Sequence, residues 1–430
     1  MIELSIYTLL FTEDSKFYLY NSRSNFFSEI SEELYVIMSN SMWDKLPVEV
    51  MDELLRKEFI CESKDKFNYY YSQLLSFNAR NNDNSVLNLI LAPTTACNFA
   101  CPYCFESRNN PKTIDYETIE YLKAFVQGHK NAKVIHLTWY GGEPLLAFDK
   151  MKIIYEKLSS EKMPRIESQS IITNGYLFND EIIRFFKNTG CRHIQITIDG
   201  LYEKHSATRC LKSGNGDTFM PTILNIDKLV NELPQTVINI RVNINKENYK
   251  DFIDVANFIR NRYFGNKMIS AYPGLIREES EEKRSLCDLS FAPSERLMLH
   301  ELLRENGYDT SDFPTKSNRG CMMQNAHSYL IGPEGEIYKC WNDVGNKDAI
   351  IGSIKQSELF NESRYIKYMA QSMPFNEECR SCHAFPICDG GCSYHRYRNN
   401  FEGCNFDLCS PYKDKNKLKR ALLSGKYKNI

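Results

Sequence analysis

The chain has 430 residues, of which 42% are apolar and 25% are charged, which is ordinary for a globular protein and long enough for two or three domains. The formal net charge of −2 gives no reason to expect nucleic acid as a partner. The first residues lack the basic region and cleavage site of a signal peptide, and no apolar run reaches the roughly 18 residues of a membrane-spanning helix. We therefore expect a cytoplasmic protein with no membrane partner.

Residues 1–82 are predicted to form a small N-terminal α+β domain. Two strand-like runs, 2–11 and 16–20, flank a polar turn, and apolar spacing predicts helices over 28–39, 48–58 and 67–77. The polar stretch 78–84 is the best candidate for a linker. The run 16–20 could present a sheet edge to which an extended peptide adds as another strand.

Residues 86–275 alternate between strand and helix patterns. Strands are expected at 86–91, 134–139, 169–173, 193–198, 237–242 and 268–271, and helices at 116–127, 150–158, 180–187, 222–230 and 249–260. Such alternation predicts an α/β fold with a parallel sheet and right-handed crossovers. Six repeats suit a partial (β/α)6 barrel similar to a TIM barrel, with its site at the carboxyl ends of the strands.

The remainder divides into a charged bridging region, 276–320, and a cysteine-rich domain, 321–430. Few long periodic segments occur after residue 321, which is typical of a small domain stabilised by metal rather than by a large core. The whole chain has 15 cysteines. In a long cytoplasmic chain, clustered thiols more often bind metal than form disulfides.

The first cysteine cluster, Cys97, Cys101 and Cys104, has the spacing CxxxCxxC and directly follows the strand predicted at 86–91. Three thiolates can bind a [4Fe–4S] cluster and leave one iron open to a substrate. Zinc is the structural alternative, but it usually takes four protein ligands, and no fourth ligand lies nearby in the sequence.

This cluster and the turns after the next strands resemble the radical S-adenosylmethionine (SAM) enzymes. Aromatic Tyr103 precedes the last cysteine of the motif, and a Gly-Gly-Glu run follows the second strand. Further turns end the third and fourth strands, and a basic residue follows them. The resemblance implies that the SAM-binding residues are Tyr103, Gly141, Gly142, Glu143, Pro144, Thr173, Asn174, Thr197, Asp199 and Arg209.

The C-terminal cysteines follow a second pattern, Cx2Cx5Cx3C from Cys379 to Cys392, preceded by a hairpin-like run at 331–339. The ensemble resembles the SPASM extension of radical SAM enzymes, which carries two auxiliary [4Fe–4S] clusters and so implies three clusters in all. That resemblance assigns Cys321, Cys340 and Cys392 to the first auxiliary cluster, and Cys379, Cys382, Cys388 and Cys409 to the second. Cys404 competes with Cys409. The first set either leaves one iron open or is completed by a distant thiol such as Cys287. A pair of structural zinc sites is the alternative.

The resemblance implies reductive cleavage of SAM to a 5′-deoxyadenosyl radical that abstracts hydrogen from an unactivated carbon. The low-potential electron donor would be a flavodoxin or a ferredoxin. SPASM enzymes mostly modify peptides, and the N-terminal domain resembles the element that binds leader peptides of ribosomal natural products. We therefore expect a peptide maturase that forms a thioether or carbon–carbon cross-link in a precursor peptide with a leader and a core.

Three alternatives remain at this point. One is an enzyme similar to anaerobic sulfatase maturases, which make formylglycine and tend to carry an aspartate directly after the cysteine equivalent to Cys340. This chain has Trp341 there, with Asp343 two residues further on. The others are a radical enzyme acting on a small molecule and a non-catalytic scaffold that binds metal or a leader. The catalytic residues remain unknown, with Asp343 and Arg209 as candidates, and the sequence does not indicate an oligomeric state.

Overall fold

The computed structural model describes residues 1–104, 110–214, 216–276, 299, 305–307, 314–316, 320–356, 361–371 and 377–424. The chain divides into two compact units. One contains the middle of the chain, Asn82–Phe291 and Asn325–Met369, and we call it the core unit. The other joins both ends of the chain, Met1–Asn81, Ala292–Gln324 and Ala370–Ile430, and we call it the terminal unit.

The core unit is built on six parallel strands that are hydrogen-bonded in sequence order. These strands are β6 (Val86–Leu91), β7 (Val134–Trp139), β8 (Arg165–Thr173), β9 (Cys191–Thr197), β10 (Val237–Ile244) and β11 (Ile269–Leu275). Each pairs in parallel with the next, so their carboxyl ends meet at one edge of the sheet. The predicted α/β class and partial barrel are confirmed.

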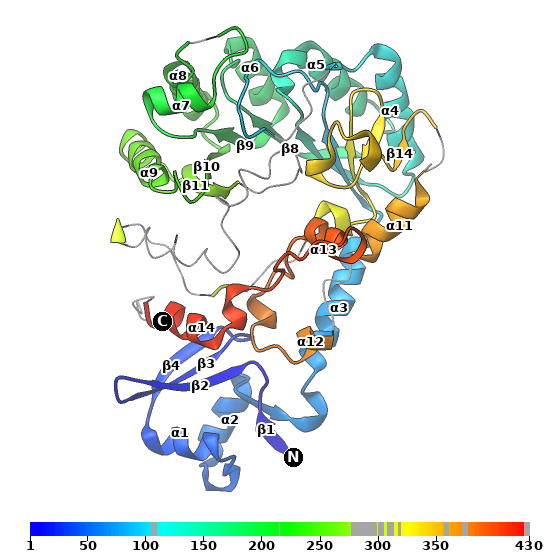
Figure 1. Ribbon diagram of the computed structural model, residues 1–430. Coiled ribbons are helices and arrows are strands. Elements are labelled where there is room, and N and C mark those ends of the chain that lie inside the picture. The colour runs from blue at the N-terminus through cyan, green and yellow to red at the C-terminus, as the bar shows by residue number, and fades with distance from the viewer. Residues whose placement is uncertain are drawn as a thin grey trace. The chain divides into compact units, whose positions relative to one another are not determined.

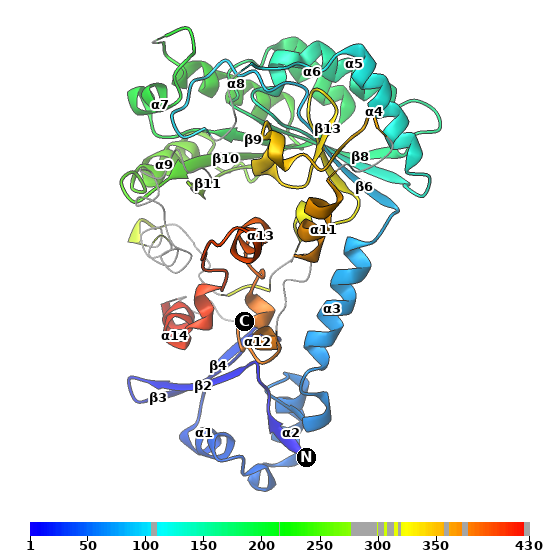
Figure 2. The ribbon, with the colours of Figure 1, turned by 45° about the vertical axis from the view of Figure 1, so that its right-hand side comes forward.

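Helices connect the strands and lie along the outside of the curved sheet (Figures 1 and 2). They are α4 (Tyr116–Gly128), α5 (Phe148–Leu158), α6 (Asp180–Thr189), α7 (Tyr202–Thr208), α8 (Phe219–Glu232) and α9 (Asp251–Arg262). Local signals explain their ends. The Asn179 side chain accepts a hydrogen bond from the backbone N–H of Ile182 at the start of α6, and Gly190 ends that helix at a φ of 74°. The sequence did not predict the short helix α7.

Three short strands extend the sheet beyond β6. Strand β12 (Ser328–Ile331) pairs in parallel with β6, and β13 (Glu336–Tyr338) and β14 (Gly352–Ser353) follow as antiparallel neighbours. The predicted hairpin at 331–339 is therefore present, and it brings Cys340 to the end of β13. Helix α11 (Glu362–Ala370) follows this extension.

The N-terminal part of the terminal unit contains two small sheets and three helices. Strand β1 (Ile2–Leu4) pairs with β5 (Ile60–Glu62), whereas β2 (Thr8–Glu13), β3 (Lys16–Asn21) and β4 (Phe26–Ile30) form a separate antiparallel sheet. The helices are α1 (Glu32–Ser39), α2 (Val48–Arg56) and α3 (Asn68–Asn81).

Two expectations for this part are corrected. The run at 16–20 is not an edge, because β3 pairs with β2 on one side and with β4 on the other. The polar stretch 78–84 is not a linker throughout, because α3 continues to Asn81. Ala79 and Arg80 favour helix and Asn is tolerated there, so polar composition alone did not reveal that this helix continues.

The C-terminal part of the same unit covers one face of the three-stranded sheet. It contains α12 (Glu377–Arg380), α13 (Ser393–Phe401) and α14 (Lys415–Ser424). Side chains on the sheet, Leu9, Phe11, Tyr20 and Phe27, form one buried cluster with Ala384, Ile387, Leu418 and Leu422. Figures 1 and 2 show α14 lying beside this sheet. Residues 1–81 thus share a hydrophobic core with the C-terminal cysteine region. In the part of the chain that the structure describes, no helix is long and apolar enough to cross a membrane.

Candidate functional site

The loop that carries Cys97, Cys101 and Cys104 follows β6 at the carboxyl edge of the sheet. Its first residues are paired with the glycine-rich turn after β7. Gly142 N donates to Thr94 O at 3.1 Å, and Glu143 N donates to Ala96 O at 2.8 Å. A Cβ atom on Gly142 would lie 2.3 Å from Ala96 O, so only glycine admits this approach. The backbone that approaches Gly142 so closely belongs to the loop that carries the three cysteines.

Glu143 connects three successive strand ends. Its side chain is completely buried, and its carboxylate accepts hydrogen bonds from Thr173 Oγ1 at 2.7 Å and from Asn174 N at 2.8 Å. Burial raises the pKa of this carboxyl group, while the hydrogen bonds oppose that rise. Asn174 also donates from Nδ2 to Asn98 Oδ1 at 2.7 Å, so the end of β8 is tied to the cysteine loop. Gly141, Glu143, Thr173 and Asn174 are therefore brought together.

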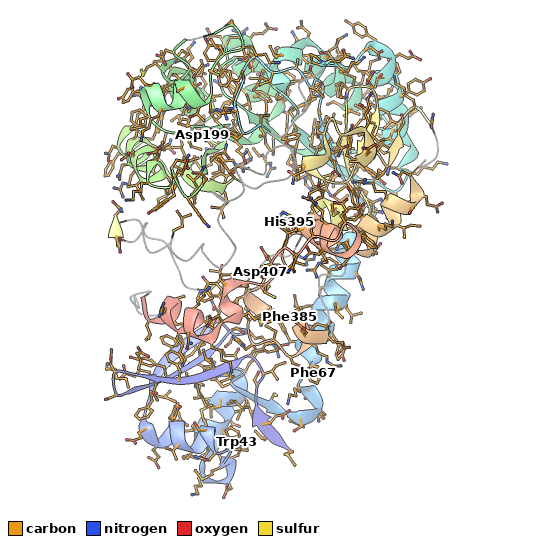
Figure 3. The ribbon with its side chains drawn as sticks, in the orientation of Figure 1. Trp43, Phe67, Asp199, Phe385, His395 and Asp407 are labelled. Carbon is orange, nitrogen blue, oxygen red and sulfur yellow. The ribbon has the colours of Figure 1, made fainter. Side chains whose placement is uncertain are left out.

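A second buried network joins the last part of the cysteine loop to β9 and β10. Tyr103 donates its hydroxyl proton to Asp199 Oδ2 and accepts hydrogen bonds from Arg209 and from Asn243 Nδ2. Arg209 Nη1 also lies 3.5 Å from Asp199 Oδ2, and Asn243 N donates to Asp199 Oδ1 at 2.7 Å. Figure 3 labels Asp199 within the core unit. Three predicted SAM contacts from distant parts of the sequence thus meet in one cluster.

The charge of Arg209 is stabilised in this network. Burial opposes the charged guanidinium, but Tyr103, Cys101 and Asp199 together raise the pKa of Arg209 above its usual value. The Nε atom of Arg209 is buried and has no hydrogen-bond partner among the described residues. A buried cation with an unsatisfied donor fits an anionic ligand group, such as the carboxylate of an amino-acid moiety.

The residues after α7 hold the cysteine loop from its other side. Ala100 N donates to Cys210 O at 2.7 Å, and Lys212 N donates to Asn98 O at 2.9 Å. His205, on α7, accepts a hydrogen bond from Asp199 N at Nδ1, and burial together with Arg209 lowers the pKa of His205 to about 3. The imidazole is therefore neutral, and its acceptor nitrogen orients the turn after β9.

The sequence missed Asn243, Asn98 and His205 as members of the site. Asn243 had a usable signal, because it is a polar residue at the carboxyl end of the fifth strand. Asn98 had none, since the spacing of the cysteines says nothing about the residues between them. The predicted contacts Pro144 and Thr197 are buried at the same strand ends, but the network described above does not include their side chains.

The three thiols of the loop are close enough to interact electrostatically. Burial raises the pKa of Cys97 to about 12, with Glu143, Cys101 and Cys104 adding to the shift, so the free thiol is neutral. The backbone N–H of Phe99 points at Cys97 Sγ at 3.4 Å, as expected for a thiolate acceptor in a metal-bound state. Among the described residues, no three His, Cys, Asp or Glu side chains converge as ligands of a single ion. A three-thiol set on one loop fits a [4Fe–4S] cluster in which three irons each take a different cysteine and the fourth iron stays open.

The terminal unit brings together the four cysteines of the second C-terminal set. Burial is the main cause that raises the pKa of Cys382, and the Cys379 and Cys409 thiols add to it. The loop after Cys388 packs against the segment before Cys409, where a Cβ atom on Gly391 would lie 2.4 Å from Leu408 O. This contact joins cysteines that are 21 residues apart in the sequence.

Helix α13 positions the segment that leads to Cys409. Asn399 accepts from Phe406 N at 2.7 Å through Oδ1 and donates from Nδ2 to Phe406 O at 2.9 Å, while His395 stacks on the Phe406 ring with centroids 4.1 Å apart. Figure 3 labels His395 and Asp407 in this unit. Cys404 interacts with Arg398. Cys409 interacts with Cys382, and Arg396 interacts with Cys409 as well as with Cys379 and Cys388.

The first C-terminal set is divided between the two units. Cys321 and Cys392 belong to the terminal unit, and Cys340 belongs to the core unit. Cys287, which was considered as a fourth ligand, lies outside the described residues.

Asp343 is buried in the short helical turn after Cys340. Its charge contributes, after burial, to the raised pKa values of Tyr338 and Tyr368. The neighbouring Trp341 packs edge-on against Tyr140 with ring centroids 4.8 Å apart. Because Tyr140 precedes the glycine-rich turn, this contact connects the Cys340 segment to the strand ends of the barrel.

Comparisons with known proteins agree with this geometry. The model of the radical SAM superfamily matches residues 91–259. The cysteine-type anaerobic sulfatase-maturating enzyme of Clostridium novyi (strain NT) is 25% identical over 358 residues, which cover 76% of this chain and 93% of that protein.

Two solved structures share the fold. Native anSMEcpe with bound AdoMet and Cp18Cys peptide has a TM-score of 0.59 at 19% identity and covers 79% of this chain and 99% of its own. SuiB of Streptococcus suis, bound to the precursor peptide SuiA, has a TM-score of 0.50 at 16% identity and covers 96% of this chain and 98% of its own. The family match, the barrel and the cysteine loop lead to one conclusion: residues 91–259 form a radical SAM domain, in a chain that shares its fold with anSMEcpe and SuiB.

Proposed function

We propose that this enzyme is a peptide maturase that cleaves SAM reductively and installs an intramolecular thioether or carbon–carbon cross-link in a ribosomal precursor peptide. The observation that carries the proposal is the N-terminal part of the terminal unit. Residues 1–81 form a folded α+β element, and the similarity to SuiB, whose structure contains its precursor peptide, extends over 96% of the chain. The similarity to anSMEcpe covers 79%.

The superfamily implies one [4Fe–4S] cluster and SAM. Cys97, Cys101 and Cys104 would hold that cluster, which supplies the electron that cleaves SAM into methionine and a radical able to abstract hydrogen from carbon. A flavodoxin or ferredoxin would be the electron donor.

The chain's own residues would position SAM. Arg209, held by Tyr103 and Asp199, presents a buried cation with a free Nε–H donor to the SAM carboxylate. Glu143 fixes the turns after β7 and β8, so that backbone groups of Gly141 and Asn174 border the same space. Because these groups are held before SAM arrives, little reorganisation is needed on binding.

Two auxiliary clusters complete the proposed cofactor set. Cys379, Cys382, Cys388 and Cys409 would bind the second one, and their grouping in the terminal unit supports this choice over Cys404. Cys321, Cys340 and Cys392 would bind the first. Asp343, three residues after Cys340, is the candidate for a base that removes a substrate proton.

The leader of the precursor would bind to residues 1–81. Since β3 is central, an extended leader segment would add at one of the sheet's outer strands, β2 or β4. The face of that sheet covered by Leu418 and Leu422 is not free to bind a peptide.

A formylglycine-generating activity is the second candidate. It is favoured by the similarity to the Clostridium novyi sulfatase-maturating enzyme over 93% of that protein. The two reactions differ in their products. A cross-link removes two hydrogen atoms from the peptide and joins two residues, whereas formylglycine is an aldehyde that reacts with hydrazides.

The test uses the full-length enzyme, reconstituted with iron and sulfide without oxygen, and reduced with dithionite. Its substrates are the short peptide encoded beside its gene, the same peptide without its leader, and a sulfatase-derived cysteine peptide. We expect 5′-deoxyadenosine, loss of two hydrogens and linked fragments in tandem mass spectra only with the leader-bearing peptide. A hydrazide-reactive aldehyde in the sulfatase peptide would refute the cross-linking function. Changing Cys97, Cys101 and Cys104 to Ala should remove about a third of the iron and all SAM cleavage.

A further inference from the structure

Two basic side chains lie among the cysteines of the second auxiliary set. Arg396, in the first turns of α13, interacts electrostatically with the thiols of Cys379, Cys388, Cys392 and Cys409. Lys413 donates from Nζ to Cys409 Sγ at 3.6 Å. The cysteine pattern itself requires neither of these cations.

Arg396 is held in place by the loop that carries the cysteines. Its backbone N–H donates to Cys392 O at 3.0 Å, and its Nη2 donates to Gly390 O. Its Nε is buried and has no hydrogen-bond partner among the described side chains and backbone. Burial lowers the pKa of Arg396, and the four thiols oppose that effect. A half-buried guanidinium whose Nε–H is buried without a partner is stabilised by negative charge nearby, which four thiolates around an iron–sulfur cluster would supply.

Lys413 is the more exposed of the two cations. Its ammonium also lies 3.4 Å from Glu378, which offsets part of its charge, and half of its side chain is accessible to solvent. The Cys409 thiol is the largest cause of the raised pKa of Lys413. We therefore expect Lys413 to act in the same direction as Arg396, with a smaller effect.

We propose that Arg396, assisted by Lys413, raises the reduction potential of the cluster bound by Cys379, Cys382, Cys388 and Cys409. A cluster becomes more negative when it gains an electron, so a fixed cation nearby stabilises the reduced form. This inference depends on the ligand set proposed above.

The role of a raised potential follows from the electron balance of cross-linking. Joining two residues removes two hydrogen atoms from the peptide. One leaves as a hydrogen atom to the SAM-derived fragment, and the other leaves as a proton to a base and an electron. An auxiliary cluster held by these cysteines would supply the acceptor for this electron, and the external donor protein would take the electron back.

The experiment is a redox titration of the reconstituted full-length enzyme, followed by electron paramagnetic resonance. The signal of interest is the one that disappears in Cys379→Ala. In Arg396→Gln, the ratio of reduced to oxidised cluster at a fixed potential should fall about tenfold, which equals about 59 mV for a one-electron couple. Lys413→Gln should lower the ratio about threefold, and Arg396→Lys should restore it to near the wild-type value.

Arg398→Gln is the matched control. It removes the same charge from the same helix, but Arg398 pairs with Glu402 at 3.0 Å and interacts with Cys404 instead of the four thiols. Its potential should equal that of the wild type. An unshifted potential in Arg396→Gln at wild-type iron content, or an equal shift in Arg398→Gln, would overturn the inference and leave the ligand set intact. If Arg396→Gln fails to assemble the cluster, Lys413→Gln decides the question. No iron loss in Cys379→Ala would overturn the ligand set as well.

Discussion

Replacing Phe11 with Ala tests whether residues 1–81 and the C-terminal cysteine region fold together. Phe11 is 2% exposed, stacks on Tyr18 and Phe27 with ring centroids 5.2 and 5.9 Å apart, and belongs to the buried cluster with Leu418 and Leu422. Truncation of a buried Phe to Ala costs about 3–5 kcal/mol. The lower value suits this site, because a sheet of three short strands can partly close around the cavity.

A loss of about 3 kcal/mol lowers hydrogen-exchange protection by roughly 100-fold for amides that exchange through unfolding of the shared core. We expect this loss in peptides from both β2 and α14, measured on the full-length protein by mass spectrometry. The control is Phe264→Ala, the same truncation at a side chain that is 89% exposed, which should change protection little. Unchanged protection of α14 in Phe11→Ala would refute a shared core.

Three further predictions concern the sites. Tyr103→Phe removes the hydroxyl that holds Arg209 and Asp199, so SAM should bind about tenfold more weakly in equilibrium dialysis while the iron content stays the same; unchanged affinity would contradict the network. His205 has a pKa lowered from 6.5 to about 3, so the stability of the folded state is complete above pH 6.5 and falls as the pH drops toward 3, by at most about 1.4 kcal/mol per pH unit. His205→Asn should flatten this slope in urea unfolding between pH 6.5 and 5, and a slope equal to the wild type would exclude His205 as its origin. Cys409→Ser should remove the second auxiliary signal in iron and resonance measurements and Cys404→Ser should retain it; the reverse result would exchange their roles.

The local sequence pattern was sufficient to predict the fold of the core unit. The six strands and most of their helices were predictable, because apolar periodicity and turn residues act over a few positions and parallel crossovers allow little choice of topology. The turns after β7, β8 and β9 were predicted as a site because they resemble those of radical SAM enzymes, and they meet because the carboxyl ends of parallel strands lie at one edge of the sheet. No local pattern predicted which polar side chains form hydrogen bonds at this edge, such as those of Tyr103 with Asp199 and Asn243.

The tertiary structure alone decided how the two ends of the chain combine. The sequence of residues 1–82 predicted a separate domain with a free strand at 16–20, yet that strand is central, and one sheet face is covered by residues more than 350 positions away. An alternating strand shows that one face must be buried, but not what buries it. Likewise, the hydrogen bonds of Asn399 with Phe406 tie helix α13 to the segment before Cys409, and no local pattern predicted this contact. The hydrophobic effect does not depend on which segments supply the apolar surface. Contacts between the two ends of the chain are therefore decided only when these segments pack together.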